Sequence, residues 1–220
     1  MIVFAPHPDD ETLACGGTIA MNVSQGKEVY VVVMTDGRNS HLVTLGIERD
    51  PSPQDLIPIR KNELKRATRI LGVRRDHLVF LGFEDGSLIL HYPEAKEIVE
   101  RLLTKLRPDT IFMPDRSDAH PDHSSTGIVV SDASKSSMLN PRIYSYVVWT
   151  KSKSQGTKAS NEVDFDISPY LTIKRAAIKE YKSQFTRLFE SQRRPIIGRS
   201  MVSRFIRSTE RFTVPPRATE

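Results

Sequence analysis

The chain has 220 residues, of which 38% are hydrophobic and 27% are charged, so it is long enough to bury the core of one domain, which we expect to span residues 1–220. Its single cysteine, Cys15, excludes an internal disulfide framework and a cysteine-based zinc ribbon, and the formal net charge of +5 favours anionic partners only mildly. No run of about 18 apolar residues occurs and no secretory signal precedes the first strand, so we expect a cytoplasmic protein without a membrane span.

Strands and helices are predicted to alternate in the first part of the chain. After a short first strand, we expect a helix over residues 11–24 and then the β-branched run 28–35, which is typical of a strand buried on both faces. Residues 38–58 are polar, contain three prolines and show no periodicity, which predicts a long loop. Helical spacing returns over residues 60–71 and ends at Gly72.

The same alternation continues to residue 149. Further strands are predicted at residues 77–82, 110–114 and 142–149, with helices between them at 94–106 and about 121–135. Alternating strands and helices are the sign of a parallel sheet with helices on both faces, so the predicted fold class is α/β.

The C-terminal part is predicted to be helical from about residue 169, after a polar break at residues 150–162. Apolar residues at helical spacing indicate one helix over about 173–188, and a further basic helix is expected within residues 196–212. Residues 213–220 are expected to form a loose tail.

Polar side chains crowd at two places, each directly after a predicted strand. Residues 7–11, "HPDDE", hold three carboxylates and one imidazole, and residues 115–123, "DRSDAHPDH", follow a later strand. Because a buried carboxylate without a partner is costly, the first cluster must be solvated, neutralised by a cation or used in chemistry. Loops at the carboxyl ends of parallel strands gather at one edge of the sheet, so the two clusters can meet.

Two nitrogens and one oxygen could then converge on a metal. His7, Asp10 and a histidine of the second cluster would form such a set and leave a position for water, as catalytic zinc sites do. Taken singly, the carboxylates could cap a helix and the histidines could be exposed loop residues, but their shared placement after strands favours a site. The other histidines lack such neighbours and are interpreted as ordinary polar residues; they are His41, His77 and His91.

Four stretches of the chain resemble one enzyme family. They are "PHPDDE" (6–11), "TDG" (35–37), the helix "RKNELKRATRILGV" (60–73) and "HPDH" (120–123). Together they are similar to the zinc-dependent N-deacetylases named for N-acetylglucosaminyl-phosphatidylinositol de-N-acetylase, also called PIG-L or LmbE-like proteins. The resemblance implies a Rossmann-like three-layer α/β/α fold with a mostly parallel sheet. It also implies hydrolysis of an acetamido group on an N-acetylglucosamine conjugate, a small-molecule substrate, with Zn2+ as cofactor.

The resemblance further implies a role for each residue that matches a motif. The matches are His7, Asp10 and His123 as zinc ligands, Asp9 as general base, His120 with its orienting carboxylate Asp122, and Arg60 and Asp36 as substrate-binding residues. Bound zinc would lower the pKa of a water molecule toward ~7, Asp9 would take its proton, and a protonated His120 would donate to the developing oxyanion. Arg38 stands where family members often carry Glu.

Three other classes of protein share part of this pattern. Two histidines and one carboxylate also describe non-haem Fe(II) oxygenases, although an oxygenase needs no water-activating base such as Asp9. Arginines of the C-terminal part could track phosphates, but no nucleic-acid motif accompanies them, so no nucleic-acid partner is expected. A dinucleotide site is disfavoured because Gly16-Gly17 is not a Gly-x-Gly-x-x-Gly turn. The sequence carries no signal for an oligomeric state.

Overall fold

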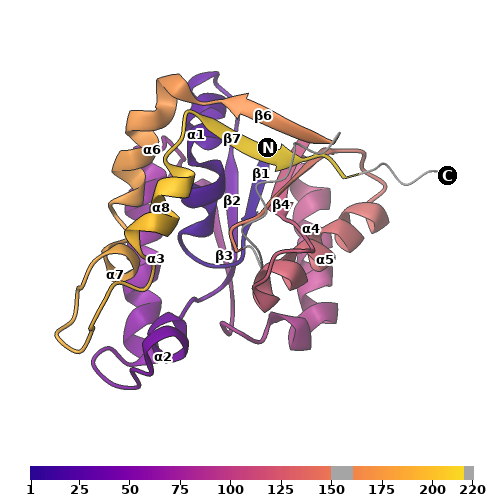
Figure 1. The fold of residues 1–220 in the computed structure, drawn as a ribbon. Helices are drawn as coiled ribbons and strands as arrows, with labels where there is room; N and C mark the ends of the chain where they lie inside the picture. The colour runs from indigo at the N-terminus through magenta and orange to yellow at the C-terminus, as the bar shows by residue number, and fades with distance from the viewer. Residues whose placement is uncertain (150–160, 216–220) are drawn as a thin grey trace.

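The computed structural model describes residues 1–149 and 161–215, which form a seven-stranded sheet with helices on both faces (Figure 1). The strands are β1 (Ile2–Ala5), β2 (Tyr30–Thr35), β3 (Leu78–Phe83), β4 (Thr110–Pro114), β5 (Arg142–Tyr146), β6 (Glu162–Asp166) and β7 (Thr209–Thr213). Their order in space is β3-β2-β1-β4-β5-β7-β6. Neighbouring strands are parallel except that β7 runs antiparallel to β5 and to β6. The prediction of an α/β fold with a mostly parallel sheet is confirmed.

The helices form the two outer layers. They are α1 (Asp10–Ser24), α2 (Ser40–Leu45), α3 (Pro53–Ile70), α4 (Tyr92–Leu106), α5 (Pro121–Ser136), α6 (Leu171–Ile178), α7 (Lys182–Phe185) and α8 (Arg199–Phe205). Helices α1, α3 and α6 cover one face of the sheet, and α4 and α5 cover the other (Figure 1). Successive residues of β1 point to opposite faces: Val3 packs with the α1 side, and Ile2 and Phe4 pack with the α5 side. A strand buried on both faces needs an unbroken apolar run, which explains the sequence of β1.

The chain reverses its direction across the sheet at β1. It leaves β1 to build β2 and β3 on one side and then returns to build β4 and β5 on the other. In sheets wound in this way, a crevice forms outside the carboxyl ends of the two strands at the switch point, here β1 and β4. The two polar clusters follow these two strands, so the topology itself brings them together.

The predicted loop at residues 38–58 is wrong, because it contains α2 and the start of α3. Helix α3 begins after a capping box: Ser52 Oγ accepts a hydrogen bond from Asp55 N (3.3 Å), and the Asp55 carboxylate accepts one from Ser52 N (2.9 Å). The first turn of a helix tolerates proline, so Pro53 supports this start rather than opposing it. The prolines were interpreted as loop residues, but Pro53 marks the start of a helix.

The C-terminal part is less helical than predicted. The helix expected over residues 173–188 is two short helices, α6 and α7, and the basic helix expected within 196–212 is helical only in α8. The chain then enters β7, where buried Glu210 and Phe212 alternate with the exposed Arg211. That alternation with a period of two is the pattern of a strand.

Two predicted boundaries also shift. The strand expected over residues 142–149 ends at Tyr146, because the chain there turns toward the second polar cluster. Thr213 belongs to β7 and not to a loose tail, since its neighbour β6 supplies backbone partners. Residues 216–220 of the expected tail and residues 150–160 of the expected polar break lie outside the described residues.

Candidate active site

The three side chains predicted as metal ligands lie together at the carboxyl ends of β1 and β4. His7 lies in the turn after β1, Asp10 begins α1, and His123 lies in the first turn of α5. Asp10 Oδ2 is 3.2 Å from His7 Nδ1 and 3.1 Å from His123 Nε2. All three side chains are buried. One carboxylate oxygen, Asp10 Oδ2, therefore lies within 3.2 Å of two imidazole nitrogens that come from other elements.

The other ring nitrogen of His7 faces two carboxylates. His7 Nε2 is 3.0 Å from Asp85 Oδ1 and 3.2 Å from Asp122 Oδ2. A carboxylate behind a histidine fixes the tautomer of the ring, so this arrangement leaves Nδ1 to face Asp10 and a metal. Burial opposes a positive charge on His7, but Asp85, Asp10 and Asp122 together raise the pKa of its ring well above the usual value in the metal-free protein.

The other ring nitrogen of His123 faces the Asp118 carboxylate, without a hydrogen bond of acceptable geometry. His123 Nδ1 is 3.3 Å from Asp118 Oδ2, and the same carboxylate accepts hydrogen bonds from the backbone N–H groups of Val148 (2.7 Å) and Trp149 (3.1 Å). Although burial lowers it, the pKa of His123 is raised to about 9 in the metal-free protein because Asp10 stands beside the ring. Asp118 thus ties a candidate metal ligand to the backbone that follows β5.

These residues fit a divalent metal. His123 is fully buried, and its Nε2 makes no hydrogen bond of acceptable geometry within the described residues, even though Asp10 Oδ2 lies 3.1 Å away. A buried polar atom without a partner is costly, and coordination to a metal would satisfy it. Two imidazole nitrogens and a carboxylate oxygen are ligands that zinc uses in catalytic sites, and the same set also suits Fe(II).

Asp9, next to the candidate ligand Asp10, points elsewhere. Its Oδ2 lies 3.2 Å from Nη2 of Arg60, and its side chain is buried in the cleft lining. Burial raises the pKa of Asp9 to about 8, although the Arg60 guanidinium lowers it. A carboxylate that is not a ligand and has a pKa near neutrality is suited to accept a proton.

Arg60, predicted to bind substrate, is occupied within the protein. Its Nη1 donates to Gly37 O (2.8 Å) and its Nη2 to Pro8 O (2.7 Å), and only 2% of the residue is exposed. Gly37 has φ 67°, and a Cβ there would lie 2.4 Å from Arg60 Nη1, so both the turn and the guanidinium require glycine. These contacts give Arg60 a role in holding the loops around Asp9.

His120 lies beside the two candidate ligand histidines. Its ring centroid is 4.7 Å from that of His7 and 5.0 Å from that of His123. Burial, and to a smaller extent the neighbouring rings of His7 and His123, lower the pKa of His120 to about 4. His120 Nδ1 accepts a hydrogen bond from the backbone N–H of Asp122 (3.3 Å), so the proton of the neutral ring is on Nε2.

Asp122 differs from the role that the sequence suggested. Within the described residues, its carboxylate contacts His7 and accepts hydrogen bonds from Gly86 N (2.7 Å) and Leu88 N (3.2 Å). It orients His120 through its backbone amide and not through its carboxylate. The expected pairing of a protonated His120 with the Asp122 carboxylate is therefore replaced by a neutral His120 held by a peptide N–H.

Asp36, the other predicted substrate residue, is used in its own turn. Its carboxylate accepts hydrogen bonds from Arg38 Nε (2.8 Å) and from Arg38 N (3.1 Å). Asp36 is not among the residues that line the cleft. Arg38 thus pairs with Asp36, the residue that the resemblance predicted to bind substrate.

The cleft above these residues is narrow, with a volume of about 60 Å³. It is lined by His7, Asp9, Asp10, Ser40, Arg60, Asp85, His120, Trp149, Gln184, Ile196 and Ile197. The sequence analysis did not identify Asp85 and Asp118 as supports of the histidines. It also did not identify the wall of the cleft that the C-terminal part supplies, which consists of Trp149, Gln184, Ile196 and Ile197. Asp85 and Asp118 each follow a strand, and that placement could have identified them, whereas the wall residues carry no such signal.

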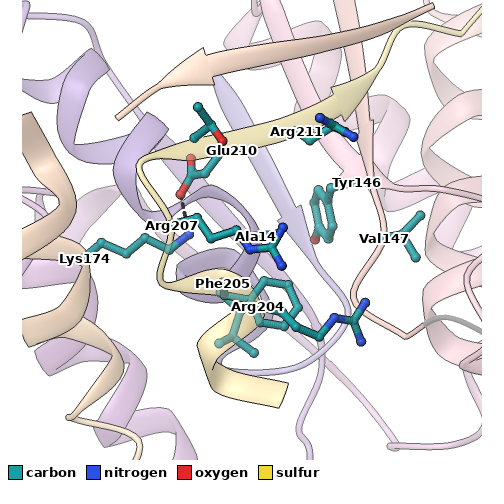
Figure 2. A pocket seen from close by; sticks show the side chains of 11 residues that line it. Ala14, Tyr146, Val147, Lys174, Arg204, Phe205, Arg207, Glu210 and Arg211 are labelled. Atoms are coloured by element: carbon teal, nitrogen blue, oxygen red, sulfur yellow. Dashed lines mark hydrogen bonds and ion pairs between the residues drawn. The ribbon is translucent and has the colours of Figure 1, made fainter. Parts of the chain in front are cut away.

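A second and larger cavity, of about 210 Å³, lies between α6, α8 and β7 (Figure 2). Arg204, Arg207, Arg211 and Lys174 line it (Figure 2). Lys174 Nζ pairs with Glu210 Oε1 (2.6 Å), and Arg211 Nε pairs with Asp164 Oδ1 (2.7 Å). Two of its cations are thus neutralised within the protein.

Comparison with known proteins identifies the family. Residues 2–134 match the family described as "PIG-L: GlcNAc-PI de-N-acetylase". The chain belongs to the PIG-L family. It is 30% identical over 197 residues (88% of this chain, 84% of the relative) to a "Probable N-acetyl-alpha-D-glucosaminyl L-malate deacetylase 2" of Bacillus anthracis. It is 29% identical over 195 residues (84% of this chain, 70% of the relative) to a "Diacetylchitobiose deacetylase" of Thermococcus kodakarensis.

A solved PIG-L relative shares the fold. The N,N'-diacetylchitobiose deacetylase of Pyrococcus horikoshii superimposes with a TM-score of 0.72 at 25% sequence identity, covering 98% of this chain and 83% of that one. These relatives are named as deacetylases, which are hydrolases of amide C–N bonds, so the expectation that the chain is an enzyme is confirmed at the level of the family. Within the described residues, no helix combines the length and apolarity that crossing a membrane requires.

Proposed function

We propose that the protein is a zinc-dependent N-deacetylase that removes the acetyl group of an N-acetylglucosamine conjugate. The observation that carries this proposal is the pairing of two roles in adjacent residues. Asp10 points at two buried imidazoles, and Asp9 points away from them with a carboxylate available for a proton. An oxygenase with the same ligand set would have no use for Asp9, which favours hydrolysis over the Fe(II) alternative.

His7, Asp10 and His123 would hold Zn2+, which supplies a Lewis acid and lowers the pKa of a water molecule toward ~7. Asp9 accepts the proton of the attacking water and later passes one to the departing amine. Asp85, Asp118 and Asp122 keep the ligand rings in place. Arg60 keeps the Asp9 carboxylate in the cleft lining.

His120 stabilises the developing oxyanion in this proposal. Its backbone-held Nδ1 leaves the Nε2–H as a donor, and a neutral imidazole can donate that hydrogen bond without prior protonation. The ring is half-buried beside His7 and His123, so the donor does not need to reorganise when charge develops.

The substrate class rests on the relatives. One relative is named for N-acetyl-glucosaminyl malate, another for diacetylchitobiose and a third, 32% identical over 136 residues, as a "Mycothiol S-conjugate amidase". The narrow cleft would admit the acetamido group, while the remainder of the conjugate would lie outside near Trp149 and Ser40. A small-molecule conjugate, with no nucleic acid, is the partner that we propose.

Acetate release tests the proposal. Purified enzyme would be assayed against N-acetylglucosamine conjugated to malate, to a second sugar, to a thiol precursor and to a lipid. We expect release from at least one conjugate, its loss after chelation, and its recovery with Zn2+ in preference to Fe2+. Absence of acetate release from every conjugate by metal-loaded protein would refute the assignment.

A further inference from the structure

Asp9 has a backbone conformation that side chains seldom adopt. Its φ is 136° and its ψ is −27°. For a residue other than glycine, such a conformation is strained and persists only where the surroundings enforce it. The residue proposed as the general base is therefore held by its neighbours against its own preference.

The peptide group between Pro8 and Asp9 is held at both ends by buried side chains. Its carbonyl oxygen, on Pro8, accepts a hydrogen bond from Arg60 Nη2 (2.7 Å), and its N–H, on Asp9, donates to Glu11 Oε2 (3.1 Å). The following carbonyl, Asp9 O, accepts from Leu13 N (2.9 Å) in the first turn of α1. With both flanking peptide groups fixed, the direction in which the Asp9 side chain leaves the backbone is fixed as well.

Glu11 is in turn held from the far part of the chain. Its Oε1 accepts hydrogen bonds from the hydroxyl groups of Thr12 and Tyr181, and both Glu11 and Tyr181 have no exposed surface. Tyr181 lies between α6 and α7, beyond the residues that match the PIG-L family. The orientation of Glu11 thus depends on a C-terminal residue that is far away in sequence.

We propose that Glu11 and Tyr181 are positioning residues for Asp9: Tyr181 orients the Glu11 carboxylate, and Glu11 fixes the peptide that aims the Asp9 side chain. This inference rests on the proposed role of Asp9 as general base. Neither residue touches the cleft, so both act on the reaction only through Asp9. A role limited to packing would not call for a carboxylate, because apolar side chains fill a buried space at lower cost than a buried charge.

The pair can be tested with variants that remove one hydrogen bond at a time. Tyr181→Phe should lower kcat about tenfold and Glu11→Ala should lower it on the order of 10²-fold, because small displacements of a catalytic group are costly. The KM and the metal content per chain should stay unchanged in both. Glu11→Gln should restore most of kcat, since its amide oxygen can still accept from Asp9 N. Adding Tyr181→Phe to Glu11→Ala should cause no further loss, because the two residues act in series.

Tyr146→Phe is the matched control. Tyr146 is also a buried tyrosine whose hydroxyl donates to a backbone carbonyl, Phe4 O (2.6 Å), but it has no link to the peptide before Asp9. It should keep kcat while losing stability. Crystal structures of the Tyr181→Phe and Glu11→Ala variants should show the Asp9 carboxylate displaced from Arg60.

Two results would overturn the inference: an unchanged kcat in both Tyr181→Phe and Glu11→Ala, or an equal loss of kcat in Tyr146→Phe. If Glu11→Ala does not fold, Tyr181→Phe and Glu11→Gln decide the matter. Asp9→Asn separates this failure from failure of the proposed function. A disabled Asp9→Asn enzyme beside fully active Tyr181→Phe and Glu11→Ala enzymes refutes only the positioning pair, whereas a fully active Asp9→Asn enzyme refutes the role of Asp9 itself.

Discussion

The two parts of the chain contribute differently to the cleft. Residues 2–134, which match the PIG-L family, supply all of its ionisable lining residues, from His7 to His120. The residues after 134 that line it are Trp149, Gln184, Ile196 and Ile197, none of which is charged. The reactive groups thus come from short motifs after strands, and the wall comes from a part of the chain whose sequence carries no such motif.

The boundary between the two parts is itself polar and buried. Three carboxylates lie there, and each accepts hydrogen bonds from the other part of the chain. Glu11 accepts from Tyr181, Glu63 from Ser183 N (2.8 Å) and Oγ (2.6 Å), and Glu210 from the backbone N–H groups of Gly17 and Thr18 (both 2.8 Å). A buried carboxylate is costly unless hydrogen bonds satisfy its oxygens. These three pairings therefore favour the one arrangement of the C-terminal part against residues 2–134 in which all of them form.

The largest effect should come from the reactive part. Asp9→Asn should keep the metal and lose roughly two to four powers of ten in turnover, the usual range for a general base. Asp10→Asn should instead lose metal during dialysis, because its carboxylate is a proposed ligand. Metal content and turnover measured on both variants separate the two neighbours. Full turnover together with full metal content in Asp9→Asn would leave Asp9 as no more than a residue before a helix.

The next effect concerns the C-terminal part and stability. Lys174→Met should lower the free energy of unfolding by about 3–5 kcal/mol, because it leaves the buried Glu210 charge without its cation. Turnover per folded molecule should not change, since Lys174 lines the second cavity and not the cleft. Denaturant unfolding and kcat would be measured on the same preparation.

Lys96→Met is the control for that experiment. It breaks a lysine–glutamate pair, with Glu100, on the surface of α4, where solvent screens the two charges and the pair contributes little to stability. If both lysine variants lost the same free energy of unfolding, the buried Lys174–Glu210 pair would stabilise the protein no more than an exposed pair does.

The sequence predicted the reactive part better than the supporting part for a physical reason. Ligation and proton transfer need particular residue types, so "HPDDE" and "HPDH" are visible in a single sequence, and their placement after β1 and β4 follows from the topology of a parallel sheet. A wall needs only shape and apolar surface, which many residues provide, so Ile196 and Ile197 look like any other apolar pair.

The errors have the same origin. The sequence analysis did not predict strand β7 because "TERFT" is short and charged. Glu210 can be buried in this strand because its carboxylate accepts hydrogen bonds from backbone N–H groups of α1, which only the folded chain brings near it. Arg60 matched a family position associated with substrate binding, and a single sequence could not show its contacts with Pro8, Gly37 and Asp9, which lie far from it along the chain. A local sequence pattern does not show which distant residues will contact a side chain in the folded protein.

Arg60→Met distinguishes a substrate-binding role of Arg60 from a role in holding Asp9. If Arg60 bound substrate, its loss would mainly raise KM. The structure instead leads us to expect a fall in kcat of about 10–100-fold with little change in KM, because the Pro8 carbonyl and the Asp9 carboxylate lose their donor and Asp9 moves. Steady-state kinetics on metal-loaded protein measures the split, and a variant with raised KM and normal kcat would restore the substrate-binding role.

The smallest expected effect lies at the Glu63–Ser183 pair on the boundary. Ser183→Ala removes the hydroxyl that donates to Glu63 and accepts from Gln184 Nε2 but keeps the backbone donor to Glu63, so it should cost about 1–3 kcal/mol of unfolding free energy. Ser136→Ala, which removes an exposed serine hydroxyl that donates to Asp132 O, should stay within about 0.5 kcal/mol of the parent.

The same pair should show in the pH dependence of stability. Burial raises the pKa of Glu63 above its usual value, although the Ser183 donors lower it in part. The folded state therefore holds the Glu63 proton to a higher pH than the unfolded state does, so this group's contribution to stability falls as pH rises from the unfolded pKa through the folded one and is constant above it.

Glu63→Gln removes that titration. The stability of the parent protein relative to Glu63→Gln should therefore decrease with rising pH across this window and then level off. In Ser183→Ala the Glu63 carboxylate loses a donor that lowers its pKa, so the decrease should extend to higher pH than in the parent. Urea unfolding at closely spaced pH values measures both curves. A difference between parent and Glu63→Gln that rises with pH would mean that the hydrogen bonds from Ser183 outweigh burial, and that the C-terminal part stabilises the charged carboxylate instead of merely covering it.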